Sequence, residues 1–159
     1  MKFYHGIIKK LLKNEVFVFG SNLHGFHGAG AAGYASFGIS GNHWREFNYA
    51  DKPNGWKGMW NVKGIGKGFQ EGTEGKSYAL ATVTRAGAKK SLTLDQIANN
   101  IMELYLFATE HPELNFYIAY SNDGRSLNGY TSREIVSCFK RSNIPDNIFF
   151  SDTLKEMFL

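Results

Sequence analysis

Cysteine is almost absent from this chain, and long apolar runs are missing. The 159 residues contain a single cysteine, Cys138, so no disulfide can form within the chain and a reducing compartment fits. No apolar run approaches the length that spans a bilayer. The N-terminus lacks the continuous apolar stretch and the small-residue cleavage site of a signal peptide. These absences predict a cytoplasmic protein with no membrane partner.

Clustered metal ligands are also lacking. His24 and His27 lie three residues apart, but the other histidines add no ligand at a compatible spacing. We therefore expect no metal site and no cofactor. Cys138 falls within an apolar helical pattern, which is typical of a small core residue rather than a nucleophile.

Acidic residues are scarce in one part of the chain, where basic residues gather. The formal net charge is +4, yet between Lys52 and Lys90 eight basic residues accompany only Glu71 and Glu74. Such a patch favours an anionic partner, or it is a solvated lysine-rich loop. No recognised RNA- or DNA-binding motif is present, so a nucleic-acid partner is not expected.

Short apolar segments alternate with helical patterns along the chain. We expect strands at "EVFVFG", "SYALATV", "NFYIAY" and "NIFF". Two capping boxes, Thr93 with Gln96 and Thr131 with Glu134, predict where two helices begin. An amphipathic basic helix is expected over 2–13. The pattern predicts one α/β domain over 1–159 with a largely parallel sheet, and it leaves the oligomeric state open.

A segment at about 41–76 has no useful periodicity and is rich in Gly, Asn, Lys and Trp. It holds every tryptophan of the chain. In one interpretation it is a lid, whose aromatic rings stack on adenine while lysines neutralise phosphates. In the other it is a satellite hydrophobic cluster under a long loop. The residues concerned are Trp44, Trp56, Trp60 and Phe69, with Lys57, Lys63 and Lys67.

The glycine-rich stretch "EVFVFGSNLHGFHGAGAAGYASFG" follows the first of these strands. Gly28, Gly30 and Gly33 fit the dinucleotide-binding pattern G-x-G-x-x-G, but seven residues separate Gly20 from Gly28, which argues against that motif. "GTEGKS" is not a phosphate-binding Walker loop, because Gln70 stands where glycine is required. A glycine-rich turn after a strand can present backbone N–H groups to a phosphate, or it can serve close packing alone.

At this point the chain resembles a known family. "VFVFGSNLHGFHGAGAA" is similar to the opening of the macro-domain-like proteins of bacteria and phages, usually a strand followed by FGSNLAGRHGAGAA. "GIGKGFQEGTEGKSYAL", "LTLDQIANNI", "ATEHPELNFYI" and "SNDGRSLNGYTSREI" resemble later parts of that family. The resemblance covers most of 15–150 and is interrupted near 41–62.

The resemblance implies a three-layer macro-domain-like sandwich around a mixed, largely parallel sheet. It also implies a pocket for an ADP-ribose-type nucleotide at the carboxyl ends of the strands, with Asn22 facing the distal ribose. The ligand-binding residues that it implies fall in two loops: Phe19, Gly20, Ser21, Asn22, Phe26, His27, Gly28, Ala29, Gly30 and Ala31, then Asn122, Gly124, Arg125, Ser126, Leu127, Asn128, Gly129 and Tyr130.

Several positions depart from the family pattern. Phe26 stands where the family often has arginine, and Arg125 and Ser126 replace Cys-Gly in the second loop. The acidic residue that hydrolytic members carry after the first glycines is missing. Asp123 is the remaining candidate catalytic acid, which could activate water, or it is an ordinary turn residue.

Two functions follow from the resemblance. In the first, the protein binds an ADP-ribose-containing, NAD-derived nucleotide and holds it unchanged; in a phage this would sequester a host immune signal. In the alternative, it is a hydrolase that removes ADP-ribose from a protein, nucleic-acid or small-molecule conjugate, with Asp123 and Asn22 as the catalytic pair. The missing acid favours the binder.

Overall fold

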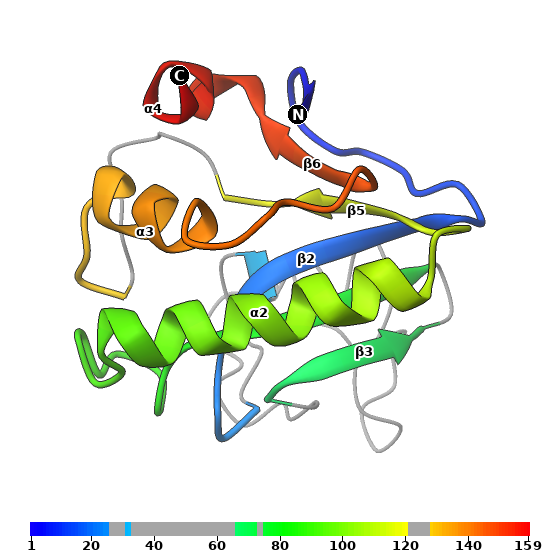
Figure 1. Ribbon diagram of the computed structural model, residues 1–159. Coiled ribbons are helices and arrows are strands. Elements are labelled where there is room, and N and C mark those ends of the chain that lie inside the picture. The colour runs from blue at the N-terminus through cyan, green and yellow to red at the C-terminus, as the bar shows by residue number, and fades with distance from the viewer. Residues whose placement is uncertain (26–30, 33–65, 73–74, 121–127) are drawn as a thin grey trace.

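A mixed sheet forms the framework of the protein (Figure 1). The computed structural model describes residues 1–25, 31–32, 66–72, 75–120 and 128–159. Within them the strand order is β1-β6-β5-β2-β4-β3; β3 runs antiparallel to β4, and the other neighbouring pairs are parallel. The strands are β1 (Lys2–Tyr4), β2 (Glu15–Asn22), β3 (Gly68–Glu71), β4 (Lys76–Val83), β5 (Asn115–Ile118) and β6 (Ile148–Ser151).

The helices follow the strands as the sequence predicts. They are α2 (Leu94–Glu110), α3 (Ser132–Phe139) and α4 (Lys155–Phe158), the last preceded by the 3₁₀ turn η3 (Asp152–Leu154). The expected α/β class with a mixed, largely parallel sheet is therefore confirmed. The predicted strands at "EVFVFG", "SYALATV", "NFYIAY" and "NIFF" correspond to β2, β4, β5 and β6.

Both predicted capping boxes are present. The Thr93 hydroxyl accepts a hydrogen bond from the Gln96 N–H at 3.1 Å, and the Gln96 side chain accepts one from the Thr93 N–H at 2.8 Å. Thr131 and Glu134 exchange the same two bonds. These bonds satisfy N–H groups that a helix start leaves without partners, so they fix where α2 and α3 begin.

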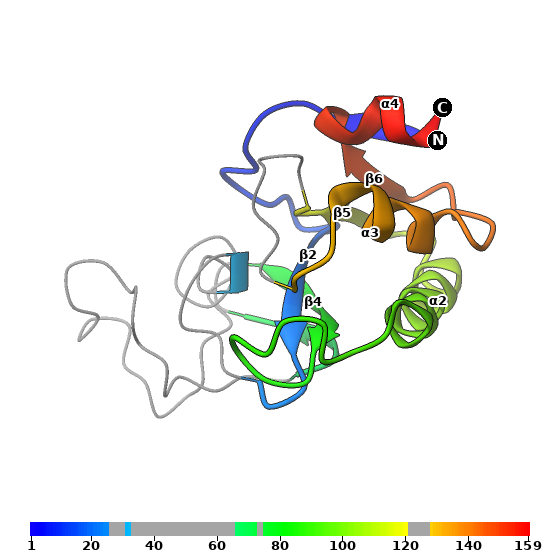
Figure 2. The same ribbon diagram turned by 90° about the vertical axis from the view of Figure 1, so that its left-hand side faces the viewer.

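The sheet buries apolar side chains on both faces. Helices α2 and α3 cover one face, where a large core includes Val16, Val18, Leu80 and the buried side of α2 (Figure 2). Cys138 lies in this core, as predicted. On the opposite face a smaller cluster consists of Leu11, Phe17, Phe19, Ala32 and Ala79. Apolar packing on both faces is compatible with a three-layer sandwich.

The helix expected over 2–13 is wrong. Lys2–Tyr4 instead form β1, which pairs with β6, and the Tyr4 hydroxyl donates a hydrogen bond to the Ile118 carbonyl at 2.7 Å. Gly6 follows with φ of +77°, which a helix does not accept. The apolar residues of 7–12 do not share a buried face either, since Leu11 is 7% exposed and Ile7 79%.

The segment at about 41–76 is not irregular throughout. Gly68–Glu71 form β3, and the Phe69 ring stacks on Phe107 with centroids 5.1 Å apart. Lys67 pairs with Glu103, with Nζ and Oε2 2.9 Å apart. Phe69 therefore packs against the core, as the packing interpretation expects, and the lid interpretation stays a prediction. Trp44, Trp56, Trp60, Lys57 and Lys63 lie outside the described residues.

None of the helices in the described part of the chain is both long enough and apolar enough to cross a bilayer.

Candidate functional site at the carboxyl edge of the sheet

The chain changes direction at the centre of the sheet. β2 lies between β4 and β5; after β2 the chain proceeds toward β4, whereas after β5 it proceeds toward β6 on the other side. In open α/β sheets ligands bind at such a switch point, outside the carboxyl ends of the strands. Both glycine loops named by the resemblance leave from this point, because the first follows β2 and the second follows β5.

β2 ends in an irregularity at the predicted ribose-facing residue. Ser21 pairs with Ala81, but Asn22 pairs with Val83, so Thr82 is an extra residue on β4. The Leu23 N–H donates to the Val83 carbonyl at 3.2 Å, and the Gly25 N–H donates to the Asn22 carbonyl at 3.0 Å. Such bulges redirect side chains and are frequent beside active sites. Asn22 is 5% exposed, so this bulge sets the position of a buried amide at the edge.

Gly66 holds the chain against the end of β2 as it returns from residues 33–65. The Ser21 hydroxyl donates a hydrogen bond to the Gly66 carbonyl at 2.5 Å. A Cβ atom at Gly66 would lie 2.5 Å from the Leu23 carbonyl oxygen and 2.8 Å from that of Asn22. Only glycine permits this approach. Gly66 therefore lies directly against the residues that begin the first loop.

At the two ends of the first loop, Phe19 and Ala31 pack in or against the smaller cluster. Phe19 is 1% exposed and packs in the smaller cluster with Ala32. Ala31 packs against the same cluster, and the backbone of both alanines is helical. Gly20, in contrast, is exposed on β2. Phe19 thus supports the first loop from within the core, and direct ligand contact by its side chain stays a prediction.

The second loop ends in a hydrogen-bonded anchor. The Asn128 side-chain oxygen accepts from the Tyr130 N–H at 2.9 Å, and the Tyr130 hydroxyl donates to the Leu92 carbonyl at 2.7 Å. Gly129 has φ of +88°, and a Cβ there would lie 2.9 Å from Cβ of Lys89. These three residues fasten the second loop to the turn after β4.

The remaining predicted site residues lie outside the described residues, and their roles stay predictions. They are Phe26, His27, Gly28, Ala29, Gly30, Asn122, Asp123, Gly124, Arg125, Ser126 and Leu127.

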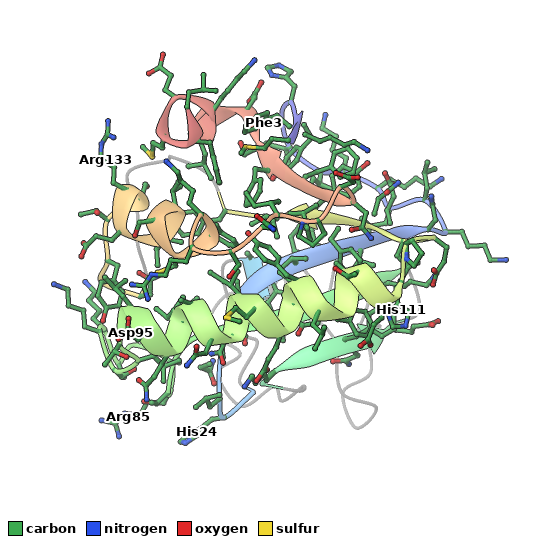
Figure 3. All side chains as sticks on the ribbon, viewed as in Figure 1. Phe3, His24, Arg85, Asp95, His111 and Arg133 are labelled. Atoms are coloured by element: carbon green, nitrogen blue, oxygen red, sulfur yellow. The ribbon has the colours of Figure 1, made fainter. Side chains whose placement is uncertain are left out.

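A basic turn also lies at this edge, and the sequence analysis did not include it in the predicted site. The turn over 84–92 follows β4 and carries exposed Arg85, Lys89 and Lys90. Arg85 and His24 both project from this end of the molecule, whereas His111 lies at the other end (Figure 3). The signal was available, because "TRAGAKKS" directly follows a strand of a sheet predicted to be parallel.

Two hollows lie among the described residues. One, of about 20 Å³, lies beneath the carboxyl edge among residues that include Gly20, Thr82 and Tyr120; it has room for about one water molecule. The other, of about 350 Å³, lies between α3 and α4. Two of its cations are engaged: Lys140 Nζ donates to the Met157 carbonyl at 3.3 Å, and Arg141 pairs with Asp95 at 2.6 Å.

Within the described residues no group of three or more histidine, cysteine, aspartate or glutamate side chains could hold a metal ion. His5 pairs with Asp152, and the His111 ring stacks on Phe107. These two imidazoles therefore have structural contacts.

No family model, curated protein or solved structure matches the chain.

Proposed function

We propose that the protein binds an ADP-ribose-containing, NAD-derived nucleotide at the carboxyl edge of the sheet, in a macro-domain-like pocket. The observation that carries the proposal is topological: the two loops singled out by the resemblance follow β2 and β5, which are neighbouring parallel strands at the switch point. Loops far apart in sequence therefore begin side by side, as a shared ligand site requires.

Local chemistry at this edge supports the same proposal. Asn22 places an amide at this edge, and an amide carries the donor and acceptor groups that ribose hydroxyls bind. The exposed basic turn after β4 supplies positive charge toward a diphosphate. The proposal extends to sequestration: the ligand is held and released unchanged, and in a phage it would be a host immune signal.

Retention followed by chromatography tests this function. The pure protein is mixed with ADP-ribose and a panel of NAD-derived nucleotides, unbound material is removed, and the protein is denatured by heat. We expect one nucleotide to be recovered intact in near-stoichiometric amount. A product peak that grows with time would contradict sequestration and indicate the hydrolase, in which case Asp123→Ala should abolish turnover. If no nucleotide is retained or altered, the proposed function is wrong.

A further inference from the structure

The turn over 84–92 is held rigidly at the end of β4. The Thr84 N–H donates to the Ser91 hydroxyl at 2.8 Å, which closes the turn across its base. Inside it, the Ala88 N–H donates to the Arg85 carbonyl at 3.1 Å. Gly87 at φ +77° and Lys90 at φ +55° make the tight reversals. Such conformations persist where the surroundings fix them, so this turn has a defined shape.

The same turn is joined to the second loop of the candidate site. The Lys90 N–H donates to the Asn128 carbonyl at 2.7 Å. Lys90 Nζ lies 5.6 Å from the centre of the Tyr130 ring. Together with the close approach of Gly129 to Lys89, these contacts make the basic turn and the end of the second loop one structural unit.

The charges on this unit are not equivalent. Lys90 lies over Tyr130, and its charge adds a little to the hydrogen bonds from Thr131 that lower the pKa of Glu134, so this charge has neighbours within the fold. The ion pairs among the described residues engage Lys67, Arg141 and His5, and none of them engages Arg85 or Lys89. Both side chains are exposed. Within the described part of the chain, these two exposed charges are therefore the ones best placed to meet an anion.

We infer that Arg85 and Lys89 contact a phosphate group of the ligand, which places the charged part of the nucleotide on the β4 side of β2. This inference rests on the proposed function and adds two residues that the resemblance does not include. Arg85 can bind phosphate through two parallel N–H groups, and Lys89 acts as a point charge. Because the contact is exposed, its strength falls as salt is raised.

A double variant tests the inference against a matched control. Arg85→Gln with Lys89→Gln removes two charges at the carboxyl edge. Lys10→Gln with Lys13→Gln removes two exposed charges from the segment that leads into the amino end of β2. We expect the first pair to weaken ADP-ribose binding about tenfold, because solvent and salt screen both exposed contacts. The control pair should bind like the native protein, and the native affinity should fall more steeply with salt than that of the first pair.

Amide NMR signals separate failure of this inference from failure of the proposed function. ADP-ribose and inorganic pyrophosphate are titrated separately while the signals of Gly87, Lys89 and Gly129 are followed. If native protein and the first pair bind ADP-ribose equally, the inference is wrong and the proposed function stands. If ADP-ribose does not bind but pyrophosphate shifts these signals, the turn binds phosphate and the proposed ligand is wrong. If neither ligand has an effect, both are wrong.

Discussion

Gly66 stands where two chain segments meet at the end of β2. Its missing side chain leaves room for the carbonyl oxygens of Leu23 and Asn22, and its own carbonyl accepts a hydrogen bond from Ser21. The residues that begin the first loop therefore depend on a residue more than 40 positions later in the chain (Ser21 and Gly66 are 45 apart). Sequence reasoning had no means to see this contact, because Gly66 is one of several glycines in a segment without periodicity.

The substitution Gly66→Ala should push the chain at residue 66 away from the end of β2. The added methyl would lie 2.5 Å from a backbone oxygen, which cannot move as a flexible side chain would. We expect the free energy of unfolding to fall by about 1–3 kcal/mol, as for other overpacked sites. Urea unfolding provides the measurement. Gly20→Ala is the matched control, since among the described residues its Cβ would meet Thr82 Oγ1 alone, at an ordinary 3.6 Å. Equal stability of the two variants would contradict the close approach.

Among the elements, those with a strong local signal were predicted well. β2 and β4 read as buried runs, and α2 and α3 carry complete capping boxes. β1 was missed because its pairing is set by β6, almost 150 residues away, while the sequence that follows it looks like an amphipathic helix. β3 was missed because its four residues obtain their partners from β4 alone. Strand propensity is easily overridden by such tertiary contacts.

The anchor of the second loop can be tested at Tyr130. Its hydroxyl donates to the Leu92 carbonyl and joins the loop to the basic turn. Tyr130→Phe leaves that carbonyl without this donor, so we expect a loss of about 1–2 kcal/mol in the free energy of unfolding. Tyr117→Phe is the control, because the Tyr117 hydroxyl bonds the Glu15 side chain rather than a loop carbonyl and is less buried, so stability should change by less than about 0.5 kcal/mol. If the urea midpoints of Tyr130→Phe and Tyr117→Phe shift equally, the hydrogen bond from Tyr130 to Leu92 does not anchor the second loop.

For the molecule as a whole, the resemblance indicates an edge of the sheet for the candidate site but not all of the residues that lie there. The resemblance named two loops, and the parallel sheet brings the starts of both loops to one edge. The resemblance did not include the contacts between the turn after β4 and the second loop. These contacts depend on the fold and bring the two segments together. Arg85 and Lys89 therefore had no place in the predicted site, although they belong to the basic segment that composition alone revealed.

Alkaline pH should destabilise the whole fold. Burial, with a smaller contribution from a nearby carboxylate, raises the pKa of Tyr4 and of Tyr78 from 10.0 to about 12. Burial also raises the pKa of Tyr105. The unfolded chain then loses these protons first, so the stabilising contribution is complete below pH 10.0 and is lost as pH rises toward 12.

Urea unfolding at about pH 9 and about pH 11 measures this loss. We expect a lower free energy of unfolding at the higher pH, and a smaller loss in Tyr78→Phe. An unchanged value across this range would contradict the burial of these hydroxyl groups.

The central claim is that the carboxyl edge beside Asn22 binds an ADP-ribose-type nucleotide. The most direct measurement is a calorimetric titration of ADP-ribose into the native protein, Asn22→Ala and Asn147→Ala, each first shown to be folded by thermal unfolding. Asn147 is the control because its amide donates to carbonyls of Ala108, His111 and Leu114, away from the carboxyl edge. We predict one bound nucleotide, about tenfold weaker binding in Asn22→Ala, and unchanged affinity in Asn147→Ala. No binding to the native protein, or equal affinity of the Asn22 variant, would contradict the claim.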